Sequence, residues 1–132
     1  MSMKIINPKK WQKPVGYSNA IKTDGGNTVY LGGQVAFDSD LKVIGKGDLV
    51  AQFEQVMKNL ATVMEEAGGS LRDIVKLTIF VKDRDDYIKH GKAIGSSYRW
   101  HFGDHYPAMT LVEISRFYEE GVLLEIEGIA VF

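Results

Sequence analysis

The chain contains no cysteine, only three prolines and no long apolar run, and each absence excludes a class of protein. Without cysteine there is no disulfide framework, no thiol nucleophile and no thiolate metal site, which suits a reducing compartment. No window approaches the roughly eighteen apolar residues that a membrane span needs, and Met1 to Pro14 has no apolar run typical of a secretion signal. We therefore expect a cytoplasmic protein that does not enter a membrane.

An excess of either charge is also missing. The 16 basic and 17 acidic residues are scattered along the chain and give a formal net charge of −1. Phosphate-backbone binding needs a clustered basic surface, so we expect no nucleic-acid partner. At 132 residues of ordinary composition, the chain is expected to form a single domain over residues 1–132 with one hydrophobic core.

Turn-forming residues predict a β-hairpin near the start. Strand-like segments at 18–23 and 28–37 flank Asp24-Gly25-Gly26-Asn27, whose glycines and asparagine tolerate the positive φ of tight hairpin turns. This hairpin would supply the first two strands.

Helices and strands are expected to alternate in the rest of the chain. Asp48 can cap a helix that ends at Gly68-Gly69, and its apolar residues fall on one helical face: Leu49, Phe53, Val56, Met57, Leu60, Val63, Met64 and Ala67. A β-branched strand follows at 74–81 and a second helix at about 84–102, which has Tyr87, Gly91, Ile94, Tyr98 and Phe102 on one side. Strands at 108–116 and 122–132 complete the order ββαβαββ.

This order predicts an α+β fold with a mixed sheet. Right-handed crossovers would pack both helices on the same face, which leaves the other face without a helix. Alternation places Ile74 and Phe80 on that second face, so it would be substantially apolar. Such a patch usually marks a protein interface, and self-association is the simplest cover.

The last strand carries two carboxylates on one face. Period-two alternation places Leu123, Glu125, Glu127 and Ile129 opposite a face made of Val122, Leu124, Ile126, Gly128 and Ala130. A partly buried carboxylate could act as general base or acid on a bound water or amine. The alternative is that both carboxylates are solvated or paired with a lysine or arginine.

Two further groups carry weaker signals. Gly32-Gly33-Gln34 lies inside a strand, where glycine marks either a β-bulge or the close approach of another group, such as a ligand. His101, Asp104 and His105 have a metal-like spacing, but Gly103 interrupts the helix and no further ligand follows a known spacing. We expect no metal there, and interpret the histidines as favouring the helix C-terminus.

A set of motifs along the chain resembles a known family. They are Tyr17-Ser18-Asn19-Ala20, Gly32-Gly33-Gln34, the run from Gln52 to Leu60, Glu66-Ala67-Gly68-Gly69, Asp73-Ile74-Val75-Lys76, Val81-Lys82-Asp83, Tyr106-Pro107-Ala108 and Glu125-Ile126-Glu127-Gly128-Ile129-Ala130. In this order, and over nearly the whole chain, they are similar to the Rid family, also called YjgF-type or endoribonuclease L-PSP.

The resemblance implies a chorismate-mutase-like fold and a homotrimer with small-molecule clefts between subunits. For the deaminating members it also implies hydrolysis of reactive enamines and imines, such as 2-aminoacrylate, to ammonia and a 2-oxo acid, without metal or organic cofactor. In those members an arginine after Pro-Ala or Pro-Thr binds the substrate carboxylate, which its guanidinium fork fits bidentately.

Carried over by position, the resemblance makes Glu125 the catalytic glutamate that positions water, and Tyr17 and Gly33 residues of the cleft. The arginine is absent, because Met109 follows Pro107-Ala108, and a thioether cannot pair with an anion. Gly32 stands where a serine is frequent. Gly95 occupies the position where those members have an asparagine of the cleft.

Three hypotheses follow. The first is a deaminase-type hydrolase that acts on an uncharged or differently anchored enamine or imine, with Glu125 directing water and Met109 as an apolar wall. Arg99 and Arg116 are the candidates for a substitute cation. The second is a small-molecule binding or regulatory trimer that has lost the chemistry. The third, a ribonuclease, conflicts with the neutral charge balance. We rank them in that order.

Overall fold

The computed structural model describes all residues from 1 to 132. In chain order the elements are β1 (Ser2–Ile6), β2 (Ala20–Asp24), β3 (Thr28–Gln34), α1 (Leu49–Glu66), the short 3-10 helix η1 (Leu71–Asp73), β4 (Ile74–Val81), α2 (Arg84–Lys89), α3 (Gly91–Phe102), β5 (Ala108–Glu113) and β6 (Leu124–Val131). The strand at 74–81 and the capped first helix are confirmed, and the last two strands are shorter than expected.

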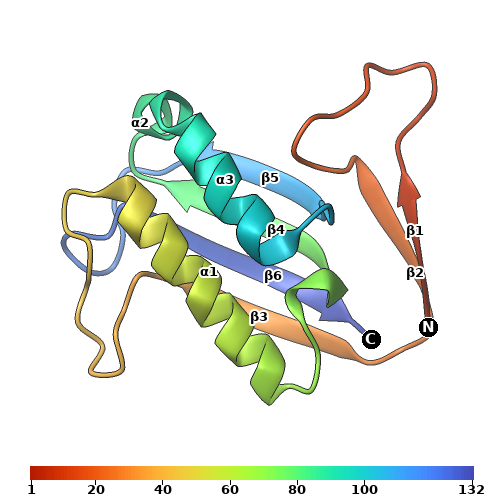
Figure 1. Ribbon diagram of the computed structural model, residues 1–132, viewed down its shortest axis with the longest axis horizontal. Coiled ribbons are helices and arrows are strands. Elements are labelled where there is room, and N and C mark those ends of the chain that lie inside the picture. Colours follow the sequence, from red (N-terminus) through yellow and green to blue (C-terminus); the bar gives the residue numbers. More distant parts are fainter.

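The core is a four-stranded mixed sheet in the order β3-β6-β4-β5. The pairs β3–β6 and β4–β6 are antiparallel, whereas β4–β5 is parallel. Helices α1 and α3 lie side by side across one face of this sheet, and the other face carries no helix (Figure 1). The expected α+β architecture with both helices on one face is therefore confirmed.

Helix α1 buries most of its predicted apolar face against the sheet, but Val63 and Ala67 at its C-terminal end are exposed. Asp48 caps it, since its side chain accepts a hydrogen bond from the Ala51 amide at 3.0 Å. Gln52 is an unexpected fully buried member of the helix. Its amide nitrogen donates to the carbonyls of Gly45 and Gly121, and its oxygen accepts from the Leu123 amide. These bonds satisfy the buried amide and tie two loops to the helix.

A β-bulge changes the face on which Ile74 lies. The register between β4 and β6 shifts between Ile74 and Lys76, so Ile74 turns to the helix side and is fully buried in the core. The prediction that Ile74 accompanies Phe80 on the uncovered face is wrong. That face also carries Lys76 and Thr78, and the Lys76 ammonium donates to the Thr110 hydroxyl at 2.8 Å. It is therefore mixed in polarity rather than apolar.

The predicted second helix is divided in two at His90. The backbone of His90, with φ −97° and ψ 16°, leaves the α-helical region, and its ring Nδ1 lies 3.0 Å from the Asp86 carbonyl oxygen. The side chain thus reaches the same acceptor as the His90 amide, which ends α2. Neither these helices nor the longer α1 has an apolar stretch that would span a bilayer.

The predicted hairpin between β2 and β3 does not form within the chain. β2 pairs with β1 instead, and β3 pairs with β6 (Figure 1). Ser18 is bonded to Pro107 beside β5, and Asn27 is bonded to Phe132 beside the end of β6. β3 and β5 form opposite edges of the sheet. Because β2 leaves from the β5 edge, it cannot lie against β3. We call the pair β1–β2 the N-terminal ribbon.

Candidate functional site

Glu125 and Gly33 form the first half of the candidate site. The register between β3 and β6 shifts between Leu31 and Gln34, so a bulge contains Gly32 and Gly33. A Cβ atom on Gly33 would overlap the Glu125 carboxylate, whereas the same atom on Gly32 would meet nothing within 4 Å. The predicted bulge is confirmed, and the group that approaches the backbone of Gly33 is the carboxylate of Glu125 in the same chain.

The Glu125 carboxylate faces away from the helices, since Glu125 pairs with Phe80 on the uncovered side of the sheet. It is half-buried beside a pocket of about 280 Å³, and no hydrogen bond or ion pair to another side chain holds it. The pocket is lined by Gly33, Val35, Phe37, Phe117, Tyr118, Glu119, Val122 and Glu125. Glu127, on the same strand face, is exposed. An unpaired carboxylate beside an apolar wall can accept a proton from water.

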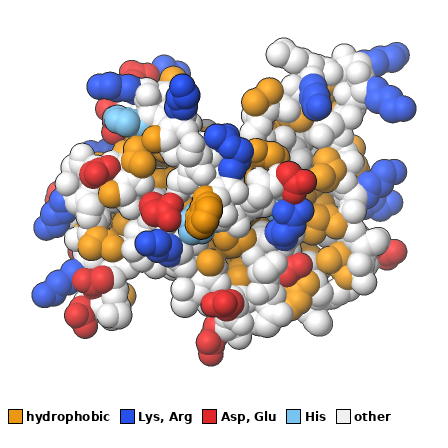
Figure 2. Space-filling view, viewed as in Figure 1, with side chains coloured by type: hydrophobic (Ala, Val, Ile, Leu, Met, Phe, Trp, Pro, Cys, Tyr) orange, Lys and Arg blue, Asp and Glu red, His pale blue; other side chains and the backbone are white.

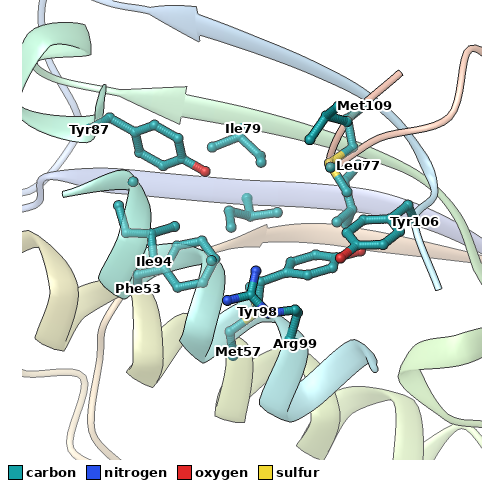
Figure 3. A pocket seen from close by; sticks show the side chains of 15 residues that line it. Phe53, Met57, Leu77, Ile79, Tyr87, Ile94, Tyr98, Arg99, Tyr106 and Met109 are labelled. Atoms are coloured by element: carbon teal, nitrogen blue, oxygen red, sulfur yellow. The ribbon is translucent and has the colours of Figure 1, made fainter. Parts of the chain in front are cut away.

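An apolar pocket of about 330 Å³ under α3 forms the second half (Figure 3). Its walls come from α1, α2, α3, β4, β5, β6, the loop before β5 and the segment before Tyr17. The residues are Val15, Gly16, Phe53, Met57, Leu77, Ile79, Tyr87, Gly91, Ile94, Gly95, Tyr98, Arg99, Tyr106, Met109 and Ile126. Burial raises the pKa of Tyr87 to about 12, so its phenol stays a neutral hydrogen-bond donor at physiological pH. Met109, on β5, lies in the wall as an apolar group.

Arg99 is the cation of this pocket. A Cβ atom on Gly95 would come within 3.1 Å of its Nη1 atom, so the absence of a side chain at Gly95 leaves the guanidinium room beside the helix. None of the ion pairs in the structure includes Arg99. Arg116 differs, because it lies 3.5 Å from Glu120 and does not line the pocket. Of the two substitute cations considered from the sequence, only Arg99 is suitably placed.

Tyr17 lies at the entrance to the same half. The next residue, Ser18, donates its amide to the Pro107 carbonyl at 3.0 Å and its hydroxyl to the Tyr106 carbonyl at 2.5 Å. These bonds fix the segment beside the start of β5, where Ala108 pairs with Ser18. Tyr17 itself is exposed. The surface is hollowed between this segment and the α2–α3 side of the molecule (Figure 2).

The two halves do not meet within one chain. Met109 pairs with Leu77 and faces the helices, whereas Glu125 pairs with Phe80 and faces the opposite side of the sheet. Met109 lines the pocket under α3 and Glu125 lines the pocket at Gly33, and neither pocket is lined by both residues. The structure therefore brings Gly33 to Glu125, and brings Tyr17, Gly95, Ala108 and Met109 to one region, but it separates the two groups.

His101, Asp104 and His105 each have a different partner. His101 binds Glu54 at 2.8 Å, while His105 is buried and its Nε2 lies 2.6 Å from the Ile74 carbonyl oxygen. Asp104 accepts from Arg72, and this hydrogen bond lowers the pKa of its carboxyl. No cluster of three or more metal-binding side chains occurs. His105 also lies beyond the end of α3, so it does not decorate the helix terminus as expected.

Tyr87 and Tyr106 line the pocket with polar groups, and the sequence did not predict either of them as a site residue. The helical periodicity placed Tyr87 on the buried face, which is correct, but a periodicity does not tell a packed position from the wall of a cavity. Tyr106 appeared only as part of a motif. Its ring stacks on Tyr98 with centroids 5.2 Å apart, a contact between a helix and a loop that no local pattern reveals.

Comparisons with known proteins place the chain in a family. A family model described as Endoribonuclease L-PSP matches residues 10–132. A RutC family protein of Pyrococcus abyssi is 40% identical over 131 residues, which cover 98% of each chain. A mouse protein named 2-iminobutanoate/2-iminopropanoate deaminase is 30% identical over 129 residues, with 97% of this chain and 90% of the relative covered.

Solved structures agree. YyfB of Yersinia pestis, a protein of the Rid family, superimposes with a TM-score of 0.90 at 29% identity, over 100% of both chains. The RidA protein of an Antarctic Psychrobacter gives a TM-score of 0.70 at 33% identity, over 98% of this chain and 99% of the other. The expected chorismate-mutase-like fold is therefore confirmed, and the chain belongs to the Rid/YjgF family.

Proposed function

We propose that this protein hydrolyses the C=N bond of small reactive imines, formed directly or from enamines, in a cleft between subunits of a homotrimer. The observation that carries the proposal is the Glu125 carboxylate, which lies unpaired over the bulge at Gly33 and beside a pocket. Relatives named 2-iminobutanoate/2-iminopropanoate deaminase in mouse and Salmonella typhimurium support it.

The reaction needs only a proton acceptor and a positioned water. An enamine first gains a proton at carbon and loses one from nitrogen, which converts it to an imine. Glu125 then accepts a proton from water as the oxygen adds to the imine carbon, and it returns that proton to nitrogen. The proton of the new hydroxyl then passes through Glu125 to the nitrogen as the C–N bond breaks, and ammonia and a carbonyl product leave. A positioned carboxylate contributes typically 10² to 10⁴ in rate to such proton transfers.

The substrate anchor is expected to differ from that of relatives that carry the arginine. Met109 cannot bind a carboxylate, but Arg99 lies in the same pocket without an acidic partner. A guanidinium can bind a carboxylate bidentately, so Arg99 is suited to replace the missing arginine. The mostly apolar pocket wall favours a substrate with an apolar side chain.

The assembly is part of the proposal, because the halves that hold Glu125 and Met109 are separated within one chain. A cleft made from the Glu125 half of one copy and the Met109 half of another would contain both. Cyclic oligomers repeat such a contact around the ring, which a homotrimer satisfies.

A non-catalytic binding or regulatory trimer is the second candidate. The presence of Met109 in the anchoring position favours it, since loss of a charge-assisted contact to a substrate commonly costs several kcal/mol. In that case the pocket would still bind a small molecule without converting it.

The test is release of ammonia and 2-oxo acid from enzymatically generated 2-aminoacrylate and from imines of apolar amino acids. Glu125→Gln should lower kcat at least about 100-fold without changing the unfolding midpoint. Glu127→Gln is the matched control, because that exposed carboxylate shares the strand and face but not the pocket. Release that is equal in wild type and Glu125→Gln, or absent on every substrate, would move the assignment to the binding protein.

A further inference from the structure

Strands β2 and β3, which follow each other along the chain, each have a free edge. β2 pairs only with β1, and β3 pairs only with β6. A free edge presents a row of unpaired backbone N–H and C=O groups, which is a template for another strand. The ribbon is also poorly supported, since no residue of β1 or β2 is buried, and an isolated two-stranded ribbon is marginally stable in water.

The sequence between these strands is that of a hairpin. Asp24-Gly25-Gly26-Asn27 is a strong turn signal, and Gly25 and Gly26 have φ of 76° and 87°, as tight turns need. The chain nevertheless does not close the hairpin. Ser18 is tied to the β5 edge and Asn27 to Phe132 on the β6 side, so the strands that the turn sequence would pair stand apart.

We infer that the pairing is made between molecules: β2 of one chain adds antiparallel to the free edge of β3 in a second copy. This is a domain swap, in which an element that could fold back on its own chain is exchanged for the identical element of a neighbour. The occupant of the β3 edge is therefore the ribbon of a second copy, not an unrelated peptide. The pairing does not depend on the reaction proposed above.

The register of a two-residue turn at Gly25-Gly26 fixes the expected partners. Counting outward from the turn, Ile21 lies opposite the partner's Tyr30, and Asn19 opposite the partner's Gly32. Tyr30 is 78% exposed in the single chain, an unusual state for a tyrosine in a sheet, and a strand laid on this edge would partly cover it.

The exchange has a consequence for the candidate site. One position beyond Asn19 in this register, Ser18 lies opposite the partner's Gly33. The partner's Glu125 lies over that glycine. Ser18 is fixed next to Tyr106 and Ala108, at the entrance to the pocket that contains Met109. The ribbon thus joins the Met109 half of its own chain to the Glu125 half of its neighbour.

Engineered disulfides test this exchange without any assay of activity. The natural chain has no cysteine, so the double variant Ile21→Cys/Tyr30→Cys offers one defined pair. A second pair, Thr23→Cys/Thr28→Cys, lies in the same register and guards against poor geometry at the first. Each full-length variant is oxidised mildly at low concentration and separated on a non-reducing gel. The control is Ile21→Cys/Ile88→Cys, since Ile88 is 64% exposed and lies on α2, which packs against α3 and not along the β3 edge.

The exchange predicts covalent oligomers for at least one of the two test pairs, with the inter-strand disulfide identified by mass spectrometry, and at least a fivefold smaller yield for the control. A disulfide-closed monomer would overturn the inference, because it would show that the hairpin closes within one chain. Failure of both pairs to react, or equal cross-linking of the control, would overturn it as well.

Discussion

The four-stranded core and the N-terminal ribbon differ in how their residues are stabilised. The core sheet with α1 and α3 encloses a cluster of 19 buried hydrophobic residues, and several of its side chains have no solvent exposure. The ribbon has none, and Ile5 on its outer strand is 50% exposed. The core is therefore complete within one chain, while the ribbon consists of strands whose stabilising contacts lie elsewhere.

The candidate site follows this division between core and ribbon. Each half of the candidate site is built on the core, on β6 and β3 in one case and on α3 and β5 in the other. The ribbon carries no catalytic group, but the segment that leads into it passes the Met109 pocket. Its role is expected to be the joining of halves that the core of a single chain keeps apart.

The largest expected effect concerns the core. Leu60→Ala, at a fully buried position of α1, should lower the free energy of unfolding by about 2–5 kcal/mol, because the cavity it leaves cannot collapse completely. Ile5→Ala in the ribbon should cost less than about 1 kcal/mol, since half of that side chain is already exposed. Urea denaturation of both variants at equal protein concentration makes the comparison. Equal losses would contradict the separation of core and ribbon.

A smaller effect is expected from a partly exposed polar contact between α1 and α3. Burial acts to raise the pKa of Glu54 on α1, but hydrogen bonds from Ser97 and His101 on α3 outweigh it, and the pKa is lowered below 4.5. A lowered pKa stabilises the fold above pH 4.5, and this stabilisation is lost as the pH falls through the folded-state value.

Glu54→Gln should therefore reduce stability at pH 7 by about 0.5–1 kcal/mol, a small figure because the carboxylate is 35% exposed and screened by solvent. The difference from wild type should shrink as the pH is lowered below 4.5. Unfolding midpoints measured from pH 7 to pH 3 check this, with Glu66→Gln at the exposed end of α1 as control. A difference that grows toward acid would have the wrong sign for this account.

Local patterns were sufficient where one chain supplies all the contacts. The cap at Asp48, the apolar face of α1 and the β-branched run of β4 each satisfy their partners within the core, so periodicity alone predicted them. The bulge at Ile74 was not predicted, because period-two alternation assumes an uninterrupted ladder of paired residues. The helix break at His90 was not predicted either, because it accompanies a contact between the His90 ring and the Asp86 carbonyl oxygen that no sequence period reveals.

Prediction of the site was limited in a different way. Gly33 and Glu125 are 92 positions apart, yet both stood out locally, one as a glycine within a strand and the other as a carboxylate on a strand face. The contribution of Arg99 to a pocket wall could not be predicted, because an exposed arginine on a helix is usually a solvated charge. The predicted hairpin is wrong because Ser18 is bonded to Pro107 at the β5 edge and β2 pairs with β1. Turn residues favour a pairing, but they do not specify whether the two strands belong to the same molecule.

The most direct test of the account is a subunit-mixing experiment on the proposed deaminase. Glu125→Gln and Arg99→Ala lie in different halves of the site, and each alone should release much less ammonia than wild type. If each site takes Glu125 from one copy and Arg99 from its neighbour, co-refolding equal amounts should restore both groups in about a quarter of the sites. Ammonia release well above the sum of the two parents is the predicted result, and release no greater than that sum would contradict a site shared between copies.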